Sequence, residues 1–379
     1  MPETVLEGAR SVIVAAHFDP TSRRVVAAGW DGTARVWNAT SPYRMWNSPS
    51  IADDCGLFVS HAPDSRFLAI GCRDATRIWD TAHDQLLVEL PSVAPATSDF
   101  SSPAVDAGGD RAAIARSGTV EIYELPSGRL LRTIRHGAPV NVIAFGPAGH
   151  DLVSGATDGS LLVTRDAAEP IALPASSSGI DAVAILPDGR VAAADAHGQL
   201  RFYDPDRNTL LVDLETPTRV RMLRPSSDGI RLVTIPSLTG KAAPPLLWDL
   251  AHYRLIAQLE GHAGYVFSAR FTASGVLTVG GDGAARLWER DTGRLLQTYR
   301  SSSSFLADAV IDPDQAMLVA SGNDGFLWFW DLPTGRPLWK LQAHSFRAIG
   351  LHFEGSALVT RGFSGEISRW VLPSSGRVI

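Results

Sequence analysis

The chain has 379 residues, of which 45% are hydrophobic and 20% are charged, a balance typical of a folded globular protein. Its net charge of −6 and isoelectric point near 5.9 argue against nucleic acids and anionic membranes as partners, because both attract basic proteins. No apolar run approaches the roughly 20 residues of a membrane span, and the first residues lack the features of a signal peptide. We therefore expect a cytoplasmic protein, and the preference for arginine over lysine points to a GC-rich bacterial source.

A short phrase recurs along the chain. Residues 30–37 read WDGTARVW, residues 281–288 read GDGAARLW, and residues 323–330 read NDGFLWFW. Each copy combines an Asp-Gly turn with a strand that ends in tryptophan. The copies are separated by multiples of about 40–45 residues, which is the period of a propeller-type repeat.

Each repeat is built from four short apolar stretches separated by turn residues, as in the unit around Trp288. Four short antiparallel strands form one propeller blade, and no stretch carries a sustained helical period. We therefore predict an all-β fold, a single closed β-propeller domain of four-stranded antiparallel blades over residues 1–379. The position that ends the third strand of each unit marks about nine units, at Trp37, Trp79, Tyr123, Thr164, Tyr203, Trp248, Trp288, Trp330 and Trp370.

This pattern resembles the WD40 repeat family over nearly the whole chain. The resemblance implies a hydrogen-bonded structural tetrad in the best-matching unit, formed by His262, Thr278, Asp282 and Trp288. The fourth unit keeps His136, Ser154 and Asp158 but has Thr164 in place of tryptophan, and in the fifth unit His197 stands at the aspartate position. A similar trio of side chains serves hydrolases, but its recurrence in several units indicates a structural role.

Family members often close the ring by adding an N-terminal strand to the last blade. Residues 4–8 resemble residues 257–261, the fourth strand that leads into the best-matching unit, and residues 376–379 begin a fourth strand and then stop. We expect residues 4–8 to close the last blade. A ring of nine blades is favoured, and eight blades with one spare unit is the alternative.

The resemblance places partner binding on the face that holds the turns before the first strand and after the second. Aromatic and arginine side chains are typical of interaction hot spots. The candidates for a partner-binding surface, from units seven, eight, nine and one, are Trp30, Tyr265, Phe305, Phe346, Arg347, Arg361 and Phe363. The alternative is that some of these rings are buried between blades.

Two other features have an ordinary interpretation. The Pro- and Gly-rich turn at residues 236–245 is either a partner-contacting finger or a tolerated insertion, and the insertion is favoured. Cys55 and Cys72 begin and end antiparallel neighbouring strands, which would bring them together, but a reduced pair is expected in the cytoplasm. No convincing set of metal ligands accompanies them.

The chain contains no phosphate-binding loop, nucleophile elbow or His-Glu-x-x-His motif, so we predict no catalytic, cofactor-binding or metal residues. The leading hypothesis is a non-catalytic scaffold or regulatory subunit that binds another protein or a peptide, with a separately encoded effector as a candidate partner. We expect a monomer by itself. The alternative is an enzyme that uses the propeller channel or face, with first-strand polar residues at Asn141, Asp181, Ser268, Arg270 and Asp308.

Overall fold

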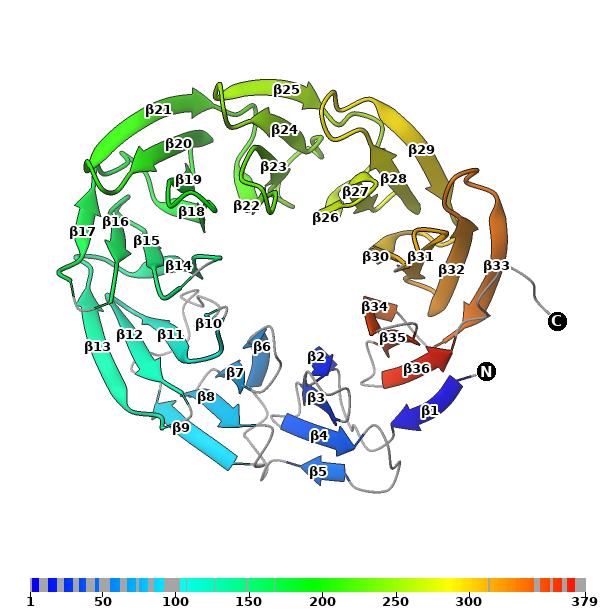
Figure 1. Cartoon of the computed structure of the whole chain (residues 1–379), viewed down its shortest axis with the longest axis horizontal. Coiled ribbons are helices and arrows are strands. Elements are labelled where there is room, and N and C mark those ends of the chain that lie inside the picture. Colours follow the sequence, from blue (N-terminus) through cyan, green and yellow to red (C-terminus); the bar gives the residue numbers. More distant parts are fainter. Residues whose placement is uncertain are drawn as a thin grey trace. The chain divides into compact units, whose positions relative to one another are not determined.

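The computed structural model describes residues 103–343 except residues 107, 126, 148, 167 and 313, together with the backbone of the strands on either side of that range. Its backbone falls into two compact units, one formed by residues 1–13 and 230–379 and the other by residues 14–229. The sheets are antiparallel and are made from strands consecutive in the chain, except that β1 joins β34, β35 and β36 (Figure 1).

The sheet of the best-matching repeat shows how the sequence specifies one repeat. It contains β26 (Val266–Thr272), β27 (Gly275–Gly280), β28 (Ala284–Trp288) and β29 (Leu295–Arg300) in chain order. The turn between β27 and β28 needs glycine, because Gly283 has a φ of 68° and a Cβ atom there would lie 2.3 Å from the carbonyl oxygen of Ser303. Close backbone packing at this turn therefore requires the glycine of the Asp-Gly pair.

The compact unit that contains residues 230–379 holds further antiparallel sheets. Strands β30 to β33 form one sheet, and β1 pairs antiparallel with β36 beside β35 and β34. The bounds are β1 (Pro2–Leu6), β23 (Arg231–Pro236), β24 (Leu246–Asp249), β25 (Arg254–Gln258), β30 (Leu306–Ile311), β31 (Met317–Gly322), β32 (Phe326–Asp331), β33 (Pro337–Gln342), β34 (Ala348–Glu354), β35 (Ala357–Gly362) and β36 (Ile367–Val371).

In the unit of residues 14–229, consecutive groups of four strands pair in the same way from β2 to β21, and β22 packs against β18. The bounds are β2 (Ile13–Phe18), β3 (Arg24–Gly29), β4 (Ala34–Asn38), β5 (Met45–Asn47), β6 (Cys55–His61), β7 (Phe67–Cys72), β8 (Ala75–Asp80), β9 (Gln85–Pro91), β10 (Ala104–Val105), β11 (Arg111–Arg116), β12 (Thr119–Glu124), β13 (Leu130–Arg135), β14 (Val140–Phe145), β15 (Leu152–Ala156), β16 (Leu161–Thr164), β17 (Ile171–Leu173), β18 (Ile180–Ile185), β19 (Val191–Asp195), β20 (Gln199–Asp204), β21 (Thr209–Glu215) and β22 (Val220–Pro225).

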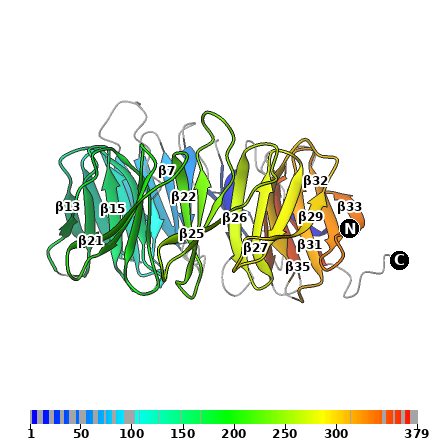
Figure 2. The same cartoon turned by 90° about the horizontal axis from the view of Figure 1, so that it is seen from above.

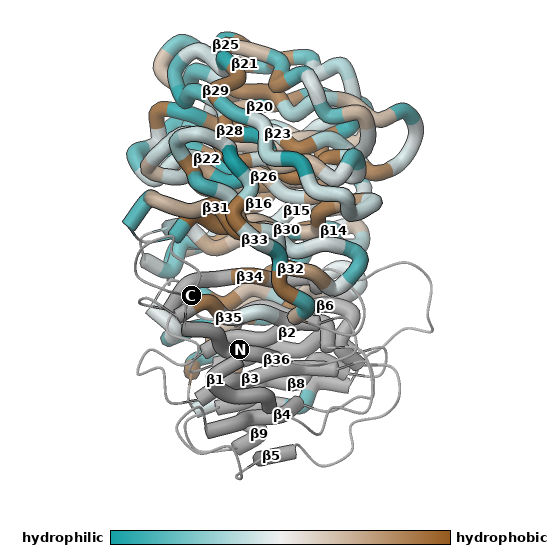
Figure 3. The backbone as a smooth tube through the Cα atoms, turned by 90° about the vertical axis from the view of Figure 1, so that its right-hand side faces the viewer, coloured by the Kyte–Doolittle hydropathy of each residue, from teal (hydrophilic) through white to brown (hydrophobic). Residues whose placement is uncertain are grey.

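The hydrophobic core lies between consecutive sheets. Every residue of β27, β28 and β31 is buried, whereas β29, at the outer edge of its sheet, has three exposed, two half-buried and one buried position. Tyr299 on β29 packs edge-on against Trp330 on β32, with ring centroids 5.9 Å apart, and its hydroxyl donates to the carbonyl of Leu332. In Figure 3 the hydrophobic colour concentrates in strands such as β31 and the hydrophilic colour in turns. Each sheet is therefore stabilised mainly by its neighbours.

Figure 2 shows β27, β29 and β31 running alongside one another, with the connecting turns at the two ends of the strands. The prediction of an all-β fold of four-stranded antiparallel sheets is confirmed, and the described residues contain no helix. Within the same part of the chain there is accordingly no helix long and apolar enough to cross a membrane. The pairing of β1 with β36 is the local contact that the expected closure needs, but closure of a ring and the number of blades remain predictions.

Candidate functional site

The structure brings the four tetrad residues into one chain of hydrogen bonds. Nε1–H of Trp288 donates to Oγ1 of Thr278 over 2.8 Å, and Nε2 of His262 lies 2.8 Å from the same oxygen. Nδ1 of His262 lies 2.9 Å from Oδ1 of Asp282. Thr278 comes from β27 and Trp288 from the end of β28, Asp282 lies in the turn between these strands, and His262 lies in the segment before β26.

A fifth residue, Arg286 on β28, completes this network and was not identified from the sequence. Its guanidinium lies 2.8 Å from Oδ2 of Asp282, and its side chain is only 3% exposed. Burial alone would raise the pKa of Asp282, but the hydrogen bond with His262 and the charge of Arg286 hold this pKa well below its usual range. The buried carboxylate is therefore ionised and paired.

The tetrad lacks the accessibility that a catalytic triad requires. Thr278 is fully buried and Trp288 is 2% exposed, so no substrate can reach the hydroxyl without unfolding the sheet. Burial lowers the pKa of His262, although the hydrogen bond with Asp282 opposes this shift, and the imidazole is neutral at pH 7. The network is suited to holding β27 and β28 together.

The more divergent repeats contain partial versions of the network. In the fourth unit, Nε2 of His136 lies 2.8 Å from Oγ of Ser154, but no indole reaches the hydroxyl because Thr164 replaces the tryptophan. Oγ1 of Thr164 is buried and has no hydrogen-bond partner among the described residues. In the sixth unit, Nε1–H of Trp248 donates to Oγ1 of Thr234 over 3.3 Å.

The fifth unit has a different centre from the one expected. The carboxylate comes from Asp195, two residues before His197, and its Oδ2 accepts hydrogen bonds from Ser176 over 2.5 Å and from Arg201 over 3.0 Å. Its Oδ1 accepts the backbone N–H groups of His197 and Gln199, each over 2.9 Å. Arg201 lies two residues before the aromatic position of its strand, as Arg286 does in β28, so an arginine paired with a buried carboxylate recurs.

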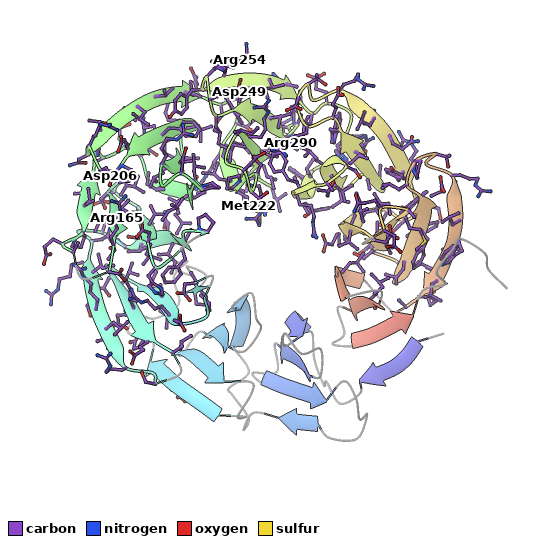
Figure 4. The ribbon with its side chains drawn as sticks, in the orientation of Figure 1. Arg165, Asp206, Met222, Asp249, Arg254 and Arg290 are labelled. Atoms are coloured by element: carbon purple, nitrogen blue, oxygen red, sulfur yellow. The ribbon has the colours of Figure 1, made fainter. Side chains whose placement is uncertain are left out.

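Ion pairs also fix turns at the outer ends of the third strands. Asp249, at the end of β24, lies 2.9 Å from Nδ1 of His252 and accepts Nε–H of Arg254 over 3.3 Å, and Figure 4 shows Arg254 beside Asp249. The hydrogen bond from His252, supported by that from Arg254, lowers the pKa of Asp249 to about 2. In the other unit Arg165 pairs with Asp206, as Figure 4 shows. These charges stabilise turns.

Two of the predicted partner-binding residues lie in the described part of the chain, and both are partly exposed aromatic residues. The hydroxyl of Tyr265 donates to the carbonyl of Gly240 over 2.5 Å, so the Pro- and Gly-rich loop at residues 236–245 is anchored beside this ring. Phe305 packs against Phe267 with ring centroids 5.3 Å apart. Phe267, on β26, was not identified from the sequence because a single phenylalanine in a strand is usually a core residue.

The other predicted partner-binding residues cannot be placed in the same way. Trp30, Phe346, Arg347 and Phe363 lie outside the described residues. Arg361 belongs to β35, where its backbone is opposite Gly350 and Ile367. Cys55 and Cys72 are register partners in β6 and β7, so antiparallel pairing does place their backbones opposite each other.

Polar residues on the first strands link neighbouring sheets. Arg270 on β26 pairs with Asp308 on β30, and Asp308 also accepts the backbone N–H of Leu351 on β34 over 3.3 Å. Burial raises the pKa of Asp308, although the charge of Arg270 opposes this shift. In the other unit, Nδ2–H of Asn141 donates to the carbonyl of Ile180, and Arg219, the residue before β22, forms a two-pronged ion pair with Asp181 on β18.

These first-strand contacts account for four of the five polar residues considered for an enzymatic channel. The side chains of Asn141, Asp181, Arg270 and Asp308 contact residues of a neighbouring sheet. The fifth residue, Ser268, is half-buried on β26. Across residues 103–343, as far as they are described, no three His, Cys, Asp or Glu side chains are grouped so that they could hold a metal ion.

Comparisons with known proteins agree with this repeat structure. The family model described as "WD domain, G-beta repeat" matches residues 1–38, 128–164, 253–289 and 293–331. The chain is 25% identical over 324 residues to the human angio-associated migratory cell protein, covering 84% of this chain and 67% of that protein. It is 23% identical over 263 residues to the nuclear distribution protein nudF of Aspergillus niger, covering 60% of this chain and 57% of that protein.

A further relative is the rat apoptotic protease-activating factor 1, which is 25% identical over 232 residues; the match covers 58% of this chain but only 18% of that protein. Among solved structures, the computationally designed Ika8 protein superposes with a TM-score of 0.59 at 20% identity, over 98% of this chain and 99% of that one. The repeated sheets and tetrad define a protein of the WD-repeat class. The chain belongs to the WD40 repeat family.

Proposed function

We propose that the protein is a non-catalytic scaffold that binds another protein or a peptide through a surface containing Tyr265, Phe267 and Phe305. The observation that carries this proposal is a group of partly exposed aromatic rings beside an anchored loop, next to a tetrad whose side chains are buried and hydrogen-bonded to one another. Aromatic rings of this kind supply much of the binding energy at protein interfaces.

The loop at residues 236–245 gives this surface a second element. Lys241 and Thr239 on the loop are exposed, and the loop backbone is held at Gly240 by the hydroxyl of Tyr265. An anchored loop loses less conformational entropy on binding than a free one, which favours affinity. We therefore assign this loop to the partner-binding surface.

Ring closure, the number of blades, the localisation and the kind of partner are also part of the proposal. We propose one closed ring, with nine blades favoured over eight and residues 4–8 completing the last blade, which agrees with the pairing of β1 with β36. We also propose a cytoplasmic monomer whose partner is a separately encoded effector, and no binding of nucleic acid or membranes, in line with the net charge of −6. The remaining candidates Trp30, Phe346, Arg347, Arg361 and Phe363 belong to the same proposed surface.

The test is affinity purification of the protein from its native host, followed by a comparison of variants. The double variant Tyr265→Ala/Phe305→Ala should weaken a co-purifying partner by about 30-fold, corresponding to about 2 kcal/mol. Leu296→Ala is a matched control, because Leu296 is 40% exposed on β29 and lies at the outer edge of its sheet. Equal partner binding by the double variant and the control would refute this surface, and turnover of a substrate without a partner would favour an enzyme.

A further inference from the structure

A cavity of about 820 Å³ is lined by residues of the unit of residues 14–229, whereas the proposed aromatic surface belongs to the other unit. One wall is the sheet of β11, β12 and β13, which contributes Arg111, Ile122 and Arg132. The rest of the lining comes from the following sheet, with His150 before β15 and with Asp166 and Glu169 between β16 and β17. The volume is in the usual range of small-molecule sites, about 300–1,000 Å³.

Two arginines converge in this cavity. Arg111 lies 2.8 Å from Oδ1 of Asp166, and Arg132 donates to the carbonyl oxygen of the same residue over 3.1 Å. Both guanidinium groups are therefore within reach of one small group. Their side chains are recessed, with 22% exposure for Arg111 and 19% for Arg132.

The acidic groups that face these arginines are much more exposed than the arginines themselves. The side chain of Asp166 is 69% exposed, and that of Glu169 is 96% exposed and lies 3.7 Å from Arg132. Ion pairs with such exposed carboxylates contribute only about 0–1 kcal/mol. A ligand oxyanion that enters the cavity can therefore replace them at little cost and bind both recessed cations.

The third polar wall residue is held in place by a buried carboxylate. Nδ1 of His150 lies 2.7 Å from Oδ2 of Asp106, which is fully buried, and Oδ1 of Asp106 accepts the backbone N–H of Asp110 over 2.9 Å. Because Nδ1 is engaged, Nε2 is the ring nitrogen of His150 that is available to a ligand in the cavity. The apolar part of the lining consists of Ile122 and Leu131.

We propose that this cavity binds a small molecule that carries an oxyanion, a carboxylate or a phosphate, on an apolar body. Arg111 and Arg132 bind the oxyanion through the planar forks of their guanidinium groups, which match carboxylate and phosphate geometry. His150 contacts its flank, and Ile122 and Leu131 contact the apolar body. This site is separate from the proposed partner surface, and its test does not depend on finding a protein partner.

The experiment is calorimetric titration of the full chain with three probes of equal chain length: hexanoate, hexyl phosphate and hexylammonium. Hexanoate or hexyl phosphate should bind, the tighter of the two identifying the oxyanion, and hexylammonium should not. Arg111→Gln and Arg132→Gln should each weaken binding about tenfold or more, the loss of a hydrogen bond to a charged group. Glu169→Gln should strengthen binding, because it removes a competing carboxylate.

The matched control is Arg207→Gln, which changes an arginine whose side chain is 79% exposed and which pairs with Asp204 in the following sheet. This variant should bind the probes like the unchanged protein, and circular dichroism should confirm that all variants are folded. Three results would overturn the proposal. These are equal affinity in Arg111→Gln and the control, binding of hexylammonium as tight as that of hexanoate, or no binding at about 10 mM, ten times a millimolar dissociation constant.

Discussion

Thr278 is the residue on which the tetrad of β27 and β28 depends, and Thr278→Val tests its role. The oxygen that this change removes accepts the indole N–H of Trp288 and lies 2.8 Å from Nε2 of His262. Valine keeps the β-branched shape that suits a strand. Because Thr278 is fully buried, water cannot take the place of the lost oxygen.

The expected cost follows from two orphaned groups. Each buried polar group left without a partner costs about 1–3 kcal/mol. The added methyl group of valine returns about 1 kcal/mol through burial of apolar surface. The variant should therefore unfold about 3 kcal/mol more easily than the unchanged protein.

Equilibrium urea unfolding, followed by circular dichroism, measures this loss as a lower midpoint at an unchanged slope. Thr234→Val is the matched control, because its hydroxyl accepts only the indole of Trp248, over 3.3 Å, among the described contacts, and its loss should be about 1 kcal/mol. Thr278→Ser should retain most of the stability. If Thr278→Val lost no more stability than Thr234→Val, the reasoning about the tetrad would be wrong.

Three further predictions concern a divergent repeat, the aspartate of the tetrad and the first strand. Thr164→Val should leave stability unchanged or raise it by about 1 kcal/mol, since Oγ1 of Thr164 is buried without a described partner; the urea midpoint measures this, and a clear decrease would contradict it. Because the pKa of Asp282 is lower in the folded protein than in the unfolded chain, its ionised carboxylate stabilises the fold fully above about pH 4, the ordinary pKa of an aspartate. This stabilisation is lost as the pH falls toward the pKa of the folded protein. Melting temperatures measured from pH 6 to pH 2 should therefore decline less steeply in Asp282→Asn than in the unchanged protein. Deletion of residues 1–8 removes β1 and exposes β36 as an edge, so the melting temperature should fall markedly, and an unchanged value would count against closure through this strand.

Much of the fold was predictable from local signals in the sequence. The Asp-Gly pairs, the short apolar strands and the aromatic residue that ends each third strand all act within a few residues of one another. Their repetition predicted the all-β architecture, because each unit needs a neighbour to cover its apolar faces. The residues of the tetrad could be named because the best-matching repeat resembles the WD40 family, and the resemblance implied a position for each of them.

The sequence by itself determined the repeat, its turns and the strands that bear the tetrad. Only the tertiary structure showed that Arg286 completes the network, that Asp195 rather than His197 is the centre of the fifth unit, and that the first strands are linked through residues such as Asp308. Only the tertiary structure showed that Arg111 and Arg132 meet Asp166, because the two arginines lie in one sheet and Asp166 follows a strand of the next sheet. Such contacts depend on the distance and orientation between sheets, which the local periodicity of a sequence does not encode.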